Sequence, residues 1–233
     1  MFENKKVFTI NISLMLAILV LDFMYMLFPS LMLKTVTSLV FVAAGVVNLL
    51  FAIAQKVDLK FPIILCVALF VAMLGDVIIN IEFMSGAIIF AVGHIFYFVA
   101  YCMLKKFSWV DLVCIIGVAI PSLCVVLFTP GLNYGAVIMK VVCCAYAAII
   151  SCMVGKALGN MIKEKTLTNI IIFIGSALFF ISDLMLLLNV FGNIKWAIVL
   201  CLLTYYVGQI IIAFGAYVWV FKSNKKSETI ANK

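Results

Sequence analysis

Long, uninterrupted apolar runs are the feature that most constrains how this chain folds. Each run extends over about 20 residues, the length that an α-helix needs to cross the hydrocarbon core of a bilayer. A transmembrane β-barrel would instead show short segments of alternating polarity. The composition agrees, because 68% of the residues are hydrophobic, 11% are charged and the mean hydropathy is +1.35. The sequence therefore predicts an all-α, polytopic bundle of transmembrane helices in one membrane domain.

Eight spans follow from the polar and helix-breaking residues between the runs. The first run contains Asp22 and lacks a cleavage site of small residues, so we interpret it as a helix and not as a signal peptide. A single transmembrane domain, 1–221, is expected to precede a polar cytoplasmic tail, 222–233. The predicted spans are 7–28, 31–54, 61–81, 86–104, 111–129, 134–155, 168–190 and 195–221.

The sixteen basic residues, all of them lysines, predict the orientation of the spans. All but three lie at the N-terminus, in loops that follow even-numbered spans, or in the tail, and Lys156 is assigned to one of these loops. The three exceptions are Lys34 and Lys140 inside spans and Lys195 in an odd-numbered loop. By the positive-inside rule, both termini of this multi-pass protein are expected on the cytoplasmic side of the cell membrane. The net charge of +7 then suits anionic lipid, and no basic, aromatic-interleaved patch indicates nucleic acid.

The cysteines and the single histidine argue against disulfides and metal sites. All eight cysteines fall inside apolar runs without paired spacing, so we expect packed free thiols. One histidine and the lack of a Cys-x-x-Cys pair make a transition-metal site improbable.

Matching residues in the two halves of the chain indicate an internal duplication at offsets of 106–108 residues. Four spans separate the two members of each pair, so the halves would have the same orientation, as in parallel repeats. The bundle would then consist of two parallel four-helix repeats. The pairs are Lys34 with Lys140, Asp76 with Asp183, Phe83 with Phe191, Tyr97 with Tyr205, and Tyr101 with Gln209.

Charged side chains inside the spans are the best candidates for a functional site. A charge near the bilayer centre costs at least about 2.5–3.5 kcal/mol, so such a residue usually faces a cavity and a partner. Asp76 and Asp183 are expected about 8–10 Å below the outer ends of their helices, at a rise of 1.5 Å per residue. The same layer is expected to hold Lys34, Lys140, His94 and Asp22.

Helical phase gives these residues polar companions. His94, Tyr97 and Tyr101 are spaced i, i+3 and i+7, and therefore share one face. Further polar faces are expected at Asp76 with Asn80 and at Tyr205 with Gln209. A structural interpretation stays open beside the functional one, in which buried Asp–Lys bridges hold the bundle together.

Four short segments, in three parts of the chain, resemble sequence blocks of the YhhN family. Residues 72–77 and 93–97 are similar to its Gly-Asp and His-x-x-Tyr blocks. Residues 175–183 resemble its Gly-Ala-x-x-Phe-x-x-Ser-Asp block, and 205–209 resemble its closing Tyr-Tyr-x-x-Gln block. The resemblance covers nearly the whole chain in order, length and number of helices.

Characterised members of that family are lysoplasmalogenases. The resemblance therefore implies a membrane-embedded hydrolase of the vinyl ether bond of lysoplasmalogen, which releases a fatty aldehyde and a glycerophospho-ethanolamine or -choline. It implies that Asp76 and Asp183 are catalytic, and that the partners are a lysophospholipid substrate and membrane lipid. One carboxyl would protonate the alkene and the other would stabilise the cation, as two carboxyls share duties in glycosidases. No metal or organic cofactor is needed for this chemistry.

Other polar residues are candidates for binding the substrate. Tyr97, Tyr101 and Tyr205 would orient water or the lipid oxygens, and Lys34 or Lys140 would hold the phosphate. The whole set of substrate-binding candidates is Lys34, Asn80, His94, Tyr97, Tyr101, Lys140, Tyr205 and Gln209.

A proton-coupled secondary transporter of a small or lipid-like solute is the main alternative. Repeats with buried carboxylates are typical of such carriers, although Pro121 has no counterpart in the first helix to form paired helix breaks. A structural or regulatory membrane protein is a third interpretation. The sequence leaves open which aspartate is the acid, the head group and chain length, vinyl ether against ester linkage, and the oligomeric state.

Overall fold

The computed structural model describes residues 2–231, with side chains described for 4–224, and this part of the chain forms eight α-helices. Each of the eight is long and apolar enough to cross a membrane, which confirms the predicted all-α bundle. The helices are α1 (Phe2–Leu27), α2 (Leu31–Ala54), α3 (Lys60–Ile78), α4 (Phe83–Leu104), α5 (Trp109–Phe128), α6 (Val137–Lys163), α7 (Leu167–Gly192) and α8 (Ala197–Ala231).

Several helix ends differ from the predicted spans, and their caps explain part of the difference. α3 ends at Ile78 and α4 begins at Phe83, because Glu82 caps α4 by accepting hydrogen bonds from the backbone N–H groups of Met84 and Ser85 at 2.8 and 2.6 Å. Hydrogen bonds from Ser85 and Met84 lower the pKa of this carboxyl. α8 runs on to Ala231, so the helix includes most of the polar tail.

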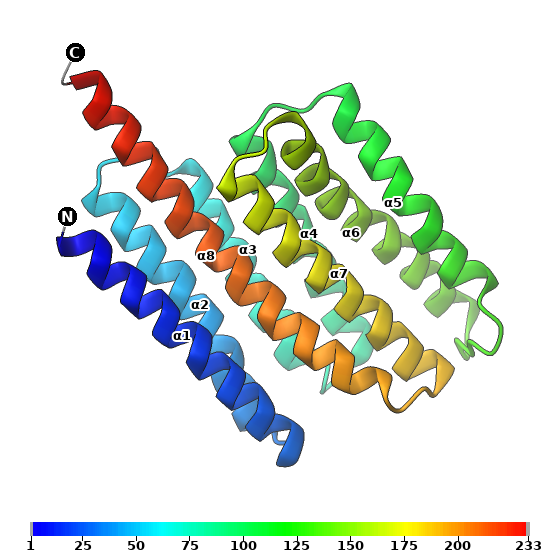
Figure 1. The fold of residues 1–233 in the computed structure, drawn as a ribbon. Coiled ribbons are helices and arrows are strands. Elements are labelled where there is room, and N and C mark those ends of the chain that lie inside the picture. The colour runs from blue at the N-terminus through cyan, green and yellow to red at the C-terminus, as the bar shows by residue number, and fades with distance from the viewer. Residues whose placement is uncertain (1, 232–233) are drawn as a thin grey trace.

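Six helices form a closed ring in the order α2, α3, α4, α6, α7 and α8. Within the described residues, α1 packs outside this ring against α2 and α8, whereas α5 packs against α6 alone. Figure 1 shows α1 and α5 at opposite edges of the bundle, and both chain ends at one end of it. We call that end the terminal face and the other end the far face.

The order of the ring is the one expected of two parallel four-helix repeats. α2 lies between α3 and α8, and α6 lies between α7 and α4 in the same way. In such a duplication α5 corresponds to α1, and α4 corresponds to α8. The correspondence fails at these outer helices, because α1 packs on α8 whereas α5 does not pack on α4. The second half of the bundle is therefore more open than the first.

Aromatic side chains fill the centre of the ring. Tyr205 of α8 makes edge contacts with Phe41 of α2, Phe90 of α4 and Phe179 of α7, with ring centroids 5.3–6.0 Å apart. All four side chains are at most 5% exposed. Such edge-to-face pairs add specific geometry to apolar burial, so this cluster fixes the spacing of the helices around it.

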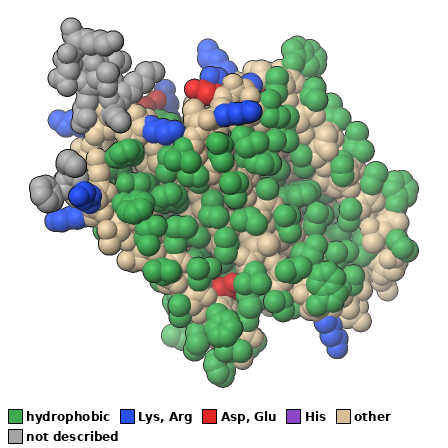
Figure 2. All heavy atoms as spheres, viewed as in Figure 1, with side chains coloured by type: hydrophobic (Ala, Val, Ile, Leu, Met, Phe, Trp, Pro, Cys, Tyr) green, Lys and Arg blue, Asp and Glu red, His purple; other side chains and the backbone are tan. Residues whose placement is uncertain are grey.

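The outer surface of the bundle is apolar, as contact with lipid requires. Figure 2 shows hydrophobic side chains over most of the visible face, with lysines gathered along the edge near the termini. Trp109 and Trp196 are 80% and 60% exposed near helix ends, where tryptophan commonly anchors a span at the membrane interface. The sidedness of the protein in the membrane stays a prediction from the lysine distribution.

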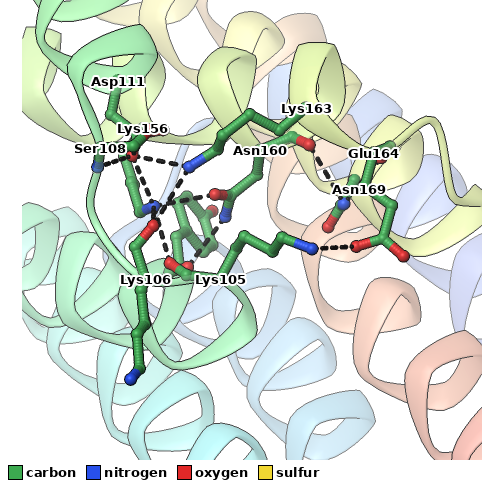
Figure 3. Close-up of polar contacts among 10 residues, drawn as sticks. Lys105, Lys106, Ser108, Asp111, Lys156, Asn160, Lys163, Glu164 and Asn169 are labelled. Carbon is green, nitrogen blue, oxygen red and sulfur yellow. Dashed lines mark hydrogen bonds and ion pairs between the residues drawn. The ribbon is translucent and has the colours of Figure 1, made fainter.

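A buried polar cluster anchors α5 to α6 near the terminal face, and we call its members Ser108, Asp111, Lys156, Asn160 and Lys163 the terminal cluster. Figure 3 shows Lys156 and Lys163 pointing toward Asp111, at 3.1 and 2.7 Å from its Oδ2. Lys156 also donates to Asn160 Oδ1 at 2.8 Å and to two backbone carbonyl oxygens of the α4–α5 loop. The same Asp111 oxygen accepts from the Ser108 N–H at 2.7 Å.

The assignment of Lys156 to a loop was wrong. α6 continues eight residues past the predicted end at 155, and Lys156 is 0% exposed inside it. Small residues make this possible, since a Cβ added at Gly159 would lie 2.3 Å from Asp111 Oδ1. Lys156 therefore contributes to packing and not to the surface charge of the terminal face.

Candidate functional site

Asp76 lies near the end of α3 in a dense polar network. Its Oδ1 forms an ion pair with Lys34 Nζ of α2 at 2.9 Å. Its Oδ2 accepts hydrogen bonds from Ser38 of α2 at 2.5 Å and from Tyr206 of α8 at 3.0 Å. Asp76 is 4% exposed and Lys34 is 7% exposed. The expected proximity of Lys34 and Asp76 is found, and both carboxylate oxygens are engaged.

Asp183 lies within α7 in a different environment. The Tyr146 hydroxyl of α6 donates to its Oδ2 at 2.6 Å, and His94 Nε2 of α4 lies 3.3 Å from the same oxygen. His94 Nε2 and the Tyr146 hydroxyl are 2.8 Å apart, so the three side chains form one connected group. We call it the Asp183 triad.

A cavity of about 60 Å³ opens beside the Asp183 triad. Its lining comes from α4, α5, α6 and α7 with the end of α3, and is almost wholly apolar. Asp183, Tyr146 and Ser122 are its polar lining residues, and Phe83, Val126 and Phe191 line it near the far face. A water molecule needs roughly 10–15 Å³ by this measure, so a few waters fit beside Asp183.

The two aspartates lie on opposite sides of the aromatic core. Asp183 lines the cavity and its side chain is 11% exposed, whereas Asp76 does not line it. Phe90 stands between them, because it lines the cavity and also packs against Gly75, the residue before Asp76.

Most of the other candidate residues bind one another inside the bundle. The Tyr97 hydroxyl donates to Gln209 Oε1 at 2.5 Å, and the Tyr101 hydroxyl lies 2.8 Å from Ser176 Oγ. Tyr205 donates to the Ala72 carbonyl at 3.3 Å, and Asn80 donates to the Asp76 carbonyl at 2.7 Å. These side chains do not line the cavity. Tyr97 and Tyr101 join α4 to α8 and to α7, and Tyr205 joins α8 to α3.

Lys140 is not the partner of Asp183 that the repeat pattern suggests. Its Nζ lies 6.0 Å from the centre of the Tyr134 ring, and it has no acidic partner among the described residues. Tyr134 in turn packs on Phe191, with ring centroids 4.9 Å apart, and donates to the Val126 carbonyl at 2.7 Å. Phe191 and Val126 line the cavity, whereas Lys140 and Tyr134 do not, so Lys140 lies near the far face behind these lining residues.

Tyr134 stays a neutral phenol beside Lys140. Burial raises the pKa of Tyr134 to about 12, with the neighbouring thiols of Cys143 and Cys144 adding to the effect. The Lys140 ammonium therefore faces the ring of a neutral phenol in a cation–π contact.

The predicted common depth of the charged residues was only partly right. Asp76 lies two residues before the end of α3, about 3 Å, and Asp183 lies nine residues before the end of α7, about 13 Å. The difference arises because α3 ends earlier and α7 later than predicted. His94 and Tyr146 match the depth of Asp183, while Lys34 matches Asp76.

Tyr146 was missed by the sequence analysis although it binds Asp183. Tyrosine in a membrane protein usually lies near the end of a span, whereas Tyr146 lies in the middle of one. This position in the middle of a span was the sequence signal that could have identified Tyr146 as a site residue.

Asp22 on α1 is 1% exposed, and its Oδ1 has no hydrogen-bond partner among the described residues.

The described residues hold no group of three or more histidine, cysteine, aspartate or glutamate side chains that could bind a metal ion. All eight cysteines, which lie in this part of the chain, are free thiols.

Comparison with family models places the chain. The model of the YhhN family matches residues 30–216, which is most of the sequence. The chain belongs to the YhhN family. The comparison with curated proteins and the comparison with solved structures each gave no match.

The match to the YhhN family begins at the start of α2 and ends within α8, so it covers the whole helix ring. Asp76 and Asp183, which end two of the family-like blocks, occupy the two polar environments described above. His94 from a third block joins Asp183, and Tyr205 and Gln209 from the fourth lie in the core between the helices.

Proposed function

We propose that this YhhN family member hydrolyses the vinyl ether bond of lysoplasmalogen inside the membrane. The observation that carries the proposal is the position of Asp183, a carboxyl at the wall of an apolar cavity in a membrane bundle. A vinyl ether is apolar at the reacting atoms and stable to base, but it hydrolyses once an acid protonates its outer alkene carbon. An acid in an apolar, lipid-accessible cavity suits that bond.

Asp183 supplies the acid and recovers its proton in the same cycle. Its carboxyl transfers a proton to the outer alkene carbon, and the double-bond electrons leave an oxocarbenium ion at the carbon attached to oxygen. Water adds to that carbon and returns a proton to the Asp183 carboxylate. The resulting hemiacetal breaks its bond to the glycerol oxygen and gives aldehyde and alcohol. One carboxyl acts as acid and then as base, as one carboxyl does in retaining glycosidases.

Asp76 has a different duty in this proposal. Its two oxygens are occupied by Lys34, Ser38 and Tyr206, so it is a fixed negative charge that joins α2, α3 and α8. Asp76 does not line the cavity, so it acts by holding these helices in place and not at the reacting atoms. The two aspartates that the family resemblance marks as catalytic are therefore a proton donor, Asp183, and a positioning residue, Asp76.

Lys140 is the proposed phosphate ligand. It lies six residues before Tyr146 on α6, a rise of about 9 Å toward the far face. Five bonds join a vinyl ether oxygen to the phosphorus in a lysophospholipid, which is a shorter span than this rise, and the flexible Lys140 side chain would cover the difference. The lipid would then keep its natural orientation in the leaflet on the far side, with the head group near the far face and the vinyl ether beside Asp183. Its chain would leave between α4 and α5, which do not pack on each other within the described residues.

The test is aldehyde release by the purified full-length protein in detergent. Three lysophospholipids with the same head group would be compared, carrying an alkenyl, an alkyl ether or an acyl chain. The proposal expects aldehyde from the alkenyl lipid alone, and in D₂O one deuterium at the carbon beside the aldehyde carbonyl. If fatty acid were released from the acyl lipid faster than aldehyde from the alkenyl lipid, the substrate would be an ester and not a vinyl ether. If none of the three lipids were hydrolysed, the proposed hydrolase activity would be excluded and a proton-coupled carrier would be favoured.

A further inference from the structure

His94 holds a buried nitrogen without a hydrogen-bond partner. The side chain is 0% exposed, and its Nδ1 has no partner among the described residues. The other nitrogen, Nε2, lies 2.8 Å from the Tyr146 hydroxyl and 3.3 Å from Asp183 Oδ2. The ring packs on Phe179, with centroids 4.7 Å apart, so its position is fixed.

The unpartnered Nδ1 decides the direction of the hydrogen bonds in the Asp183 triad. In one direction His94 Nε2–H donates to the Tyr146 oxygen, and the Tyr146 hydroxyl donates to Asp183 Oδ2. In the opposite direction Asp183 donates from Oδ2 to Tyr146, and Tyr146 donates to Nε2, which moves the ring proton to Nδ1. A buried N–H without an acceptor is costly and rare, so the first direction is favoured.

The first direction leaves only one place for a proton on the Asp183 carboxyl. Oδ2 accepts from Tyr146 at 2.6 Å and faces His94 Nε2–H at 3.3 Å, so a proton on Oδ2 would meet two donors. Oδ1 has no hydrogen-bond partner among the described residues, and the side chain is 11% exposed and lines the cavity.

The described surroundings of Asp183 hold no lysine partner, because Lys140 faces Tyr134 and not Asp183. The cavity beside the carboxyl is almost wholly apolar. The acid form of Asp183, which the proposed function requires, can therefore present its proton to a substrate in this cavity only from Oδ1.

We infer that His94 and Tyr146 form a one-way hydrogen-bond chain that ends on Oδ2 of Asp183 and places the proton of the acid form on Oδ1, inside the cavity. Both are positioning residues, because they act on the substrate only through Asp183. The use of that proton rests on the proposed function, whereas its position is a property of the resting protein. After proton transfer, the same two donors stabilise the carboxylate until water returns the proton to Oδ1.

Infrared spectroscopy of the purified full-length protein tests the position of the proton without any substrate. The difference spectrum between wild type and Asp183→Asn isolates the carbonyl stretch of a protonated Asp183. Because Oδ2 is the carbonyl oxygen in the inferred state, Tyr146→Phe removes a hydrogen bond to it and raises the frequency of this band. Tyr217→Phe is the matched control, since the Tyr217 hydroxyl donates to the Asn4 carbonyl and not to Asp183.

Two results would overturn the inference: the lack of a protonated-carboxyl band that depends on Asp183, or a band that Tyr146→Phe leaves in place. Turnover gives a second readout, where Tyr146→Phe is expected to lower kcat about tenfold to a hundredfold with KM nearly unchanged. A protein in which Tyr146→Phe changed KM and not kcat would contradict the positioning role. If the wild type released no aldehyde, the proposed function would fail while the infrared band still decided the position of the proton.

Discussion

Lys34 and Asp76 form a buried ion pair with 2.9 Å between Nζ and Oδ1, whereas their counterparts in the second half of the chain, Lys140 and Asp183, do not pair. The first half of the bundle is closed by this bridge and by α1, which packs against α2 and α8. The second half holds the cavity at the corresponding place, because α5 stays away from α4. The first half thus holds the buried bridge, and the cavity lies between α4 and the helices of the second half.

Removing one member of the first-half bridge is expected to destabilise the bundle. Lys34→Met leaves Asp76 buried without its cation and should cost about 3–5 kcal/mol of unfolding free energy. The double variant Lys34→Met/Asp76→Asn should recover most of that loss, because no unpaired charge remains. Unfolding in detergent followed by circular dichroism measures both, with exposed Lys60→Met as control. A single variant as stable as the double one would contradict this account of the pair.

The two lysines of the terminal cluster should contribute unequally to the free energy of unfolding. Lys156 is fully buried and bound to Asp111, Asn160 and two carbonyl oxygens, so Lys156→Met should cost about 3–5 kcal/mol. Lys163 is 15% exposed at its side chain, and its loss leaves Asp111 paired, so Lys163→Met should cost less than half as much. The same unfolding measurement checks the order. An equal or reversed order would show that Lys156 is not the main anchor of α5.

The sequence predicted the number of helices because each apolar run has the length of a span and lysines mark the turns. It placed Lys34 and Asp76 in one layer from helical rise and left buried Asp–Lys bridges open as a structural interpretation, and the Lys34–Asp76 ion pair is such a bridge. It did not predict the partners of Asp183. The repeat pattern suggests Lys140 as the partner, but equivalent positions make equivalent contacts only where the two halves pack alike, and α5 stays apart from α4. Lys156 was misplaced because a lysine near a span end resembles a loop residue unless its small neighbours, such as Gly159, are recognised as a packing surface.

Filling the cavity should block turnover without removing any polar group. Ala147 of α6 lines the cavity and is 6% exposed, so Ala147→Phe would place a ring where the chain of the lipid is proposed to lie. The expected result is a loss of aldehyde release of tenfold or more, at a stability cost of about 1–3 kcal/mol. Ala43→Phe on the lipid-facing side of α2 is the control. Unchanged kcat and KM in a folded Ala147→Phe protein would mean that substrate does not enter this cavity.

Lys140 should matter for the phosphate and not for the chemistry. Lys140→Gln is expected to raise KM for an alkenyl lysophospholipid about tenfold, the scale of one charge-assisted contact, with kcat nearly unchanged. An alkenyl glycerol without a phosphate should show no change in KM. Lys195→Gln, an exposed lysine in the α7–α8 connection, serves as control. Equal effects on both substrates would assign Lys140 a structural role.

The central claim is that Asp183 carries the proton, and kcat for aldehyde release by Asp183→Asn tests it most directly. The variant keeps the size of the side chain and can still accept a hydrogen bond from Tyr146, so folding should be preserved. The account predicts a fall in kcat of about 10²–10⁴-fold, the usual contribution of a general acid, while Asp76→Asn retains measurable turnover. Aldehyde release by folded Asp183→Asn at the wild-type rate would contradict the account and return Asp183 to a structural role.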